Sequence, residues 1–155
     1  MERIEKRSIA VWSISSIQTS IIQLFIVGVI YYFFNSYSFV KTSGHILFVF
    51  IILKLLYELA MDPIIYRNTK YQLNEDTLII RIGGLTVEET TIPLIRIQHV
   101  DIEQSFHSRL FNLYSLNIYT AGDNHSISYI KKEVADTLKD KLISVIADKG
   151  MKLDE

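Results

Sequence analysis

IIQLFIVGVIYYFF, residues 21 to 34, is the most apolar part of the stretch that decides the fold. Residues 8 to 40 contain no Asp, Glu, Lys or Arg, and a helix that spans a bilayer needs about 20 predominantly apolar residues. A secretory signal is the alternative, but its apolar core runs for only about 7 to 15 residues before a cleavage site with small residues. The stretch is longer than that, so it predicts an uncleaved transmembrane helix.

A second apolar segment, residues 44 to 62, predicts a transmembrane helix that returns through the bilayer. As a helix its 19 residues would measure about 28 Å, close to the roughly 30 Å of the hydrocarbon core. One cation, Lys41, lies in the intervening loop. Five cations flank the predicted hairpin on its other side: Arg3, Lys6, Arg7, Arg67 and Lys70. The positive-inside rule therefore predicts a multi-pass membrane protein with both termini in the cytoplasm.

The pattern changes after residue 65 to that of a mainly-β domain. Short runs rich in β-branched and aromatic residues alternate with turn signals such as Gly83-Gly84. Pro93 suits a strand start or an edge strand. After it, the apolar residues change from odd-numbered to even-numbered positions, which predicts a β-bulge near Gln98 and His99. The last part of the chain has helical periodicity instead, with an apolar stripe: Val134, Leu138, Leu142, Val145 and Ile146. The pattern predicts a bent sheet or small barrel closed by a C-terminal helix.

These features divide the chain into four parts. The predicted parts are a cytoplasmic N-terminus at residues 1–8, a two-helix hairpin at 9–65, a β domain at 66–150 and a tail at 151–155. The fold class is a membrane α-helical hairpin plus a mainly-β barrel with a C-terminal capping helix.

IPLIRIQHVDIEQSFHSRLFNLYSLNIYTAG, residues 92 to 122, resembles the signature of the bacterial PH-domain membrane proteins. The shared features are a strand start with Pro, an Arg-Ile-Gln strand, a short Arg-Leu-Phe turn and a strand that ends in Thr-Ala-Gly. The chain departs from the family at Asp123, where relatives often have a second glycine. The resemblance implies a PH-like fold without catalytic activity. It also directs attention to possible interaction residues in the domain: Arg96, Gln98, Gln104, Arg109, Thr120 and Gly122.

The charge of the domain does not favour binding to anionic lipid or nucleic acid. Residues 66 to 155 contain 11 Lys plus Arg and 13 Asp plus Glu, a net charge of −2. The first β-hairpin has Asn74, Glu75 and Asp76 where a phosphoinositide-binding PH domain needs cations. Two interpretations of Arg96 and Arg109 are retained: one of them could line a local anion-binding pocket, or both could be ordinary surface residues.

The sequence contains little enzyme chemistry. It has no cysteine, no G-x-S-x-G motif and no P-loop. His99, His107 and His125 lack the spacing and carboxylate context of a metal site, so solvated or hydrogen-bonded structural roles are expected. We expect neither a metal nor a cofactor.

Three ionisable residues follow one face of the second helix: Lys54, Glu58 and Asp62. Polar residues also follow one face of the first helix: Ser13, Ser16, Ser20 and Gln23. In an antiparallel hairpin Asp62 should lie level with Ser13, close to the cytoplasmic interface, and both polar faces should meet within protein. Lys54 and Glu58 could form a self-contained i, i+4 pair, or they could also bind a partner helix or the polar face of the first helix.

The leading interpretation is a non-enzymatic, membrane-anchored PH-like subunit that acts by protein–protein association in the bacterial cytoplasmic membrane. The resemblance implies a membrane protein partner, such as a larger relative with repeated PH domains, and links to envelope stress or to resistance against membrane-active peptides. The alternative is a module that handles membrane lipids or a small ligand, through the barrel or the intramembrane polar face. An intramembrane enzyme that uses Glu58 and Asp62 is a third, weaker hypothesis, because no nucleophile or metal ligand accompanies them.

Overall fold

The computed structural model describes residues 1–34 and 36–151, and their side chains through residue 147. It divides the chain into two compact units, Trp12–Pro63 and a second unit made of Met1–Val11 with Ile64–Glu155. We call them the hairpin unit and the PH unit. The predicted tail at 151–155 lies outside the described residues except for Met151, which is still helical.

Two long helices form the hairpin, α1 (Ser8–Phe34) and α2 (Ser38–Asn68). Both are long and apolar enough to cross a membrane, and few of their side chains are buried. Large apolar side chains instead cover their outer surface, including Ile21, Phe25, Tyr32, Phe48, Leu53 and Leu56. A soluble core helix would bury such residues, so this surface suits lipid. Helix α2 also continues through Pro63 to Asn68, three residues beyond the predicted end of the hairpin.

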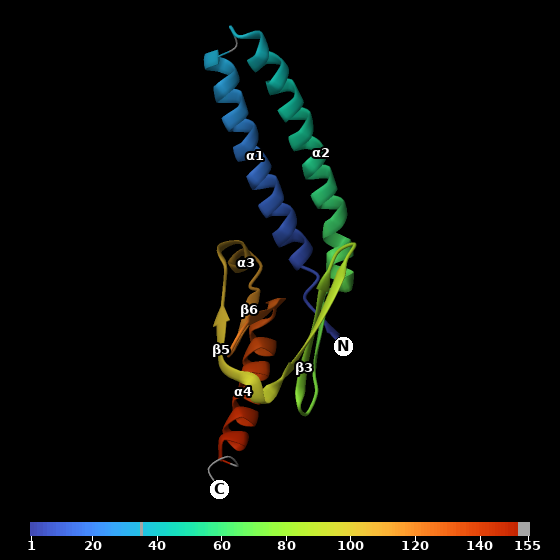
Figure 1. Ribbon diagram of the computed structural model, residues 1–155, viewed down its shortest axis with the longest axis vertical. Coiled ribbons are helices and arrows are strands. Elements are labelled where there is room, and N and C mark those ends of the chain that lie inside the picture. Colours follow the sequence, from blue (N-terminus) through green and yellow to red (C-terminus); the bar gives the residue numbers. More distant parts are fainter. Residues whose placement is uncertain (35, 152–155) are drawn as a thin grey trace. The chain divides into compact units, whose positions relative to one another are not determined.

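Contacts near both ends fix the register of the two helices (Figure 1). Near the termini, the Ser13 hydroxyl donates a 2.8 Å hydrogen bond to Oδ2 of Asp62. Near the loop, a Cβ atom added to Gly44 would lie only 3.2 Å from Cδ2 of Tyr31. Glycine therefore allows close approach of the helices there, as small residues do between helices in lipid. The predicted antiparallel register, with Asp62 level with Ser13, is confirmed.

The first sheet of the PH unit has the strand order β1-β2-β3-β4 in the described residues. Its strands are β1 (Glu2–Arg3), β2 (Lys70–Leu73), β3 (Thr77–Gly83) and β4 (Val87–Pro93). Pairing of Glu2 with Tyr71 makes the N-terminus part of the domain, which the sequence analysis did not predict. Pro93 is the last residue of β4, not the first residue of a strand. Strand β4 lies at the edge of the sheet, so the other predicted position, an edge strand, is confirmed.

The second sheet has the order β5-β6-β7. Its strands are β5 (Ile97–Glu103), β6 (Tyr114–Thr120) and β7 (Asn124–Ile130). A 3-10 turn, η1 (Leu94–Arg96), precedes β5, and the short helix α3 (Phe106–Leu110) follows it. The register shifts between Ile97 and His99, which confirms the predicted bulge.

The terminal helix α4 (Lys132–Met151) packs against β5, β6 and η1. Its predicted stripe is right in phase: Leu138 and Leu142 are buried, and Ala135 joins them. The most deeply buried apolar side chains of the PH unit come from both sheets, their connections and α4: Leu78, Leu94, Leu113, Leu116, Ile118, Ile130 and Leu142. Two antiparallel sheets with a C-terminal helix confirm the predicted fold class.

Candidate functional site

The polar residues of the hairpin form two separate interactions. Lys54 Nζ lies 3.1 Å from Glu58 Oε1 within α2. One turn further along, Asp62 is only 5% exposed, and it accepts its hydrogen bond from Ser13 of α1. Asp62 was expected simply to lie at the interface. It is in fact buried against the other helix, which a carboxyl group tolerates only with a hydrogen-bond donor.

Three buried side-chain oxygens in the hairpin unit have no hydrogen-bond partner within the described chain: Ser20 Oγ, Gln23 Oε1 and Glu58 Oε2. Ser20 is 1% exposed, although its side chain is polar. The pairs that flank Glu58 along the hairpin show where it lies. Because Asp62 faces Ser13 and Lys54 lies near Gln23, antiparallel helix geometry places Glu58 level with the stretch between Ser16, which is half-buried, and Ser20.

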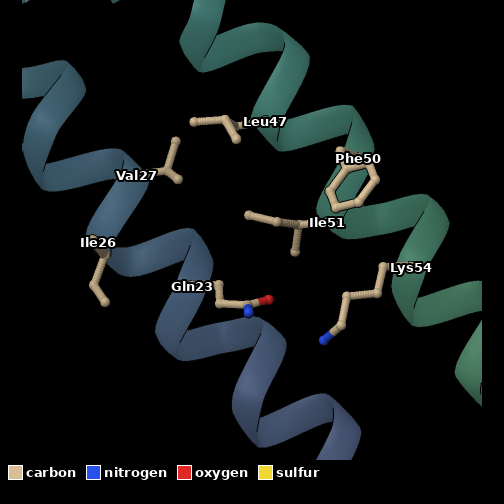
Figure 2. Close-up of a pocket in the computed structure, with 7 residues that line it drawn as sticks. All are labelled: Gln23, Ile26, Val27, Leu47, Phe50, Ile51 and Lys54. Atoms are coloured by element: carbon tan, nitrogen blue, oxygen red, sulfur yellow. The ribbon is translucent and has the colours of Figure 1, made fainter.

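A pocket of about 280 Å³ lies between the two helices, and Gln23 is one of the residues that line it. Figure 2 shows the Gln23 amide and the Lys54 amine directed toward each other across it from opposite helices. The rest of its lining is apolar: Ile26, Val27, Leu47, Phe50 and Ile51. The pocket therefore combines the Lys54 cation and the Gln23 amide with apolar side chains, whereas Ser20 and Glu58 do not line it.

This arrangement offers several groups that can bind a polar partner. Lys54 pairs with one Glu58 oxygen, and the Ser13 hydroxyl donates to the Asp62 carboxyl. The unpaired oxygens can accept hydrogen bonds, and Lys54 and the Gln23 amide can donate them. In hydrocarbon each unsatisfied polar group costs several kcal/mol, which favours any polar group that enters the site.

The candidate residues of the PH unit fall into two groups at opposite ends of β5. Ile97 pairs with Thr120, which brings the exposed residues Arg96 and Gln98 to the end of β6 that leads to Gly122. Half-buried Gln104 and exposed Arg109 lie beyond the other end of β5, before and within α3. A single anion pocket that contains both arginines is therefore not formed.

The turn after β6 is held by its own hydrogen bonds. The Thr120 hydroxyl donates to the Asp123 carbonyl at 2.8 Å and accepts from the Asp123 N–H at 3.1 Å. A Cβ atom on Gly122 would meet open space, and Gly122 does not have a positive φ. The turn therefore requires a glycine at 122 neither for space nor for backbone conformation.

Three histidines lie at separate places in the PH unit: His99, His107 and His125. His99 Nε2 lies 2.8 Å from Asp101 Oδ1, and both side chains are exposed. Across residues 1–34 and 36–151, no three His, Asp or Glu side chains come together as a metal site would require.

Several residues that were not expected from the sequence attach the N-terminus to the rest of the PH unit. Ile4 is buried, and the Glu5 N–H donates to the Tyr129 carbonyl at 2.9 Å. The buried Tyr71 hydroxyl donates a 2.8 Å hydrogen bond to Glu2, and burial and this bond together raise the pKa of Tyr71. The sequence signal for this attachment was a single isoleucine, Ile4, among charged residues.

Comparisons with known proteins agree with this architecture. The family model described as Bacterial PH domain matches residues 9–145. This range begins in α1 and ends in α4, so the match includes the hairpin as well as both sheets. The UPF0699 transmembrane protein YdbS of Bacillus subtilis (strain 168) is 27% identical over 143 residues, which are 90% of this chain and 89% of that protein. No solved structure matches the chain significantly. On this match and this fold, the chain belongs to the bacterial PH domain family.

Proposed function

We propose that the chain is a non-enzymatic subunit, anchored by α1 and α2, that associates with another membrane protein through the polar face of its hairpin. Both termini and the PH unit lie in the cytoplasm, because five cations flank the hairpin on the side of the termini and one lies in its loop.

The observation that carries the proposal is the set of unpaired oxygens on Ser20, Gln23 and Glu58. Intramembrane ionisable groups face a protein interior or a water-filled cavity in nearly all known cases. The hairpin by itself leaves these groups unsatisfied, so a further transmembrane segment with a hydrogen-bond donor such as Asn, Gln, Ser or Thr supplies what they lack. The Lys54–Glu58 pair at 3.1 Å satisfies only part of this need.

Co-purification from native membranes tests the association. Lys54→Leu with Glu58→Leu removes both charges and improves the apolar character of α2, so insertion should be maintained or improved. We expect the protein that co-purifies in stoichiometric amount with the unmodified chain to be lost. Leu53→Ala with Leu56→Ala is the matched control, because both leucines are exposed on the same helix, and it should retain the partner.

An unchanged yield of the partner with the double-Leu chain would overturn the proposal and place recognition elsewhere. Loss of a co-purified phospholipid, with no protein partner in either sample, would support lipid handling instead.

The orientation has an independent test, because the chain contains no cysteine. A cysteine at Thr42, in the first turn of α2, should react with a membrane-impermeant maleimide added to intact cells, whereas one at Asn124 should react only after lysis. The reverse pattern would refute the cytoplasmic placement.

A further inference from the structure

A second pocket lies between α1 and α2, nearer to the loop of the hairpin than the pocket in Figure 2. Its volume is about 420 Å³, within the roughly 300 to 1,000 Å³ of small-molecule sites in proteins. Gln23 and Lys54 do not line it, and the two pockets share one lining residue, Val27. We call it the loop pocket, and it is separate from the polar site described above.

Two glycines shape the loop pocket. A Cβ atom on Gly44 would lie 3.2 Å from Cδ2 of Tyr31, so the Tyr31 ring already fills the space next to Gly44. A Cβ atom on Gly28 would have no other atom within 4 Å, so Gly28 borders open space. The rings of Tyr31 and His45 meet edge to face, with centroids 6.0 Å apart, and both line the pocket. The space next to Gly28 is therefore open to a group from outside the hairpin.

The depth of the loop pocket follows from the register of the two helices. Tyr31 is 18 residues beyond Ser13, and Gly44 is 18 residues before Asp62, so both lie about 27 Å from the Ser13–Asp62 hydrogen bond. A hydrocarbon core is roughly 30 Å thick, which places Tyr31 and Gly44 near its edge on the loop side. Leu24, which also lines the pocket, precedes Tyr31 by seven residues and lies about 10 Å deeper.

The character of the loop pocket changes along this depth. Its deeper lining is apolar and includes Leu24, Val27 and Phe48. At the loop end, exposed Lys41 precedes His45 by four residues on α2, so the two lie on one face of that helix. His45 Nδ1 donates a 2.6 Å hydrogen bond to the Lys41 carbonyl, which holds the imidazole against the helix. A cation at the interface above an apolar groove complements the phosphate and the acyl chain of a phospholipid.

We infer that the loop pocket binds one phospholipid from the leaflet on the loop side, with an acyl chain next to Gly28 and the phosphate at Lys41. The inference rests on membrane insertion of α1 and α2, and it does not depend on the polar face or its partner. A second copy of the hairpin in the same orientation complements the pocket less well. Residues 8 to 57 contain no Asp or Glu, so such a copy offers Lys41 no carboxylate at this depth.

Native mass spectrometry of the full chain tests the inference. The protein is reconstituted in vesicles of phosphatidylethanolamine and phosphatidylglycerol and is then extracted in detergent. We expect one phosphatidylglycerol to stay bound to each chain. Gly28→Leu fills the open space and should lower the bound fraction severalfold, and Lys41→Gln should abolish the preference for phosphatidylglycerol over phosphatidylethanolamine. Val29→Leu is the matched control, because Val29 is exposed on the same helix but does not line the pocket, and it should retain the lipid.

Three results would overturn the inference. Gly28→Leu could retain as much lipid as Val29→Leu, Lys41→Gln could keep the preference for phosphatidylglycerol, or the unmodified chain could be a lipid-free dimer that Gly28→Leu dissociates. The last result would assign the pocket to a second copy. An alkaline carbonate wash of the membranes separates these failures from failure of insertion. A chain that stays in the membrane but binds no lipid refutes the lipid site alone, whereas a chain that is washed off refutes insertion itself.

Discussion

Ser13→Ala removes the donor that satisfies the Asp62 carboxyl between the two helices. The bond is 2.8 Å long, and Asp62 is 5% exposed, so no other part of the described chain replaces it at that oxygen. Leaving a buried acceptor unsatisfied costs about 1 to 3 kcal/mol. Hydrogen bonds between membrane helices are worth less on average, about 0.6 and at most about 1.7 kcal/mol. We therefore expect the hairpin to lose about 1 to 2 kcal/mol of its free energy of unfolding.

A second substitution should reverse this loss of stability. Asp62→Leu in the Ser13→Ala background removes the unsatisfied carboxyl and fills its space with an apolar group of similar size. Replacing a buried polar pair with packed apolar residues is often neutral or stabilising. The double variant should therefore be at least as stable as the unmodified chain, although the single Ser13→Ala variant is less stable.

Titration with sodium dodecyl sulfate in mixed micelles measures both variants, with emission from Trp12, the only tryptophan, as the signal from the hairpin. Ser43→Ala is the matched control, because its hydroxyl donates only within α2, to the Phe39 and Val40 carbonyls, and it should change stability by no more than a few tenths of a kcal/mol. The reasoning is refuted if Ser13→Ala unfolds like Ser43→Ala, or if the double variant is less stable than Ser13→Ala alone.

Two further predictions concern the PH unit. Gly83→Ala should lower the free energy of unfolding of the PH unit by about 2 kcal/mol or more in urea denaturation. The new Cβ atom would overlap the Thr86 carbonyl oxygen, and Gly83 has a φ of 158°. A stability within about 0.5 kcal/mol of the unmodified chain would contradict this prediction. The raised pKa of Tyr71 means that the folded state favours the neutral phenol, so its contribution to stability is complete below the unfolded pKa of about 10 and is lost as pH rises above it. The stability of the unmodified chain should therefore fall more steeply above pH 10 than that of Tyr71→Phe, and parallel curves would exclude the role of the Tyr71–Glu2 bond.

Much of the secondary structure could be predicted because its signals are local. The predicted turn signal Gly83-Gly84 coincides with the end of β3, and the switch in apolar positions marks the bulge after Ile97. Side chains alternate strictly along a strand, so one extra residue is visible in the sequence alone. The boundary at residue 65 was less accurate, because helix α2 continues through Pro63, whose missing N–H does not end the helix here.

The sequence by itself determines the hairpin and its polar face. The hairpin follows from the hydrophobicity of residues 8 to 40, and the polar face follows from the spacing of Lys54, Glu58 and Asp62. Which oxygens on that face stay unpaired was decided only by the tertiary structure, because that depends on the register and separation of two helices. The incorporation of Glu2 and Arg3 into the sheet was likewise a tertiary result. A two-residue strand has no periodicity of its own, and its backbone finds partners only because residues 70 and 71, distant in sequence, present a free sheet edge.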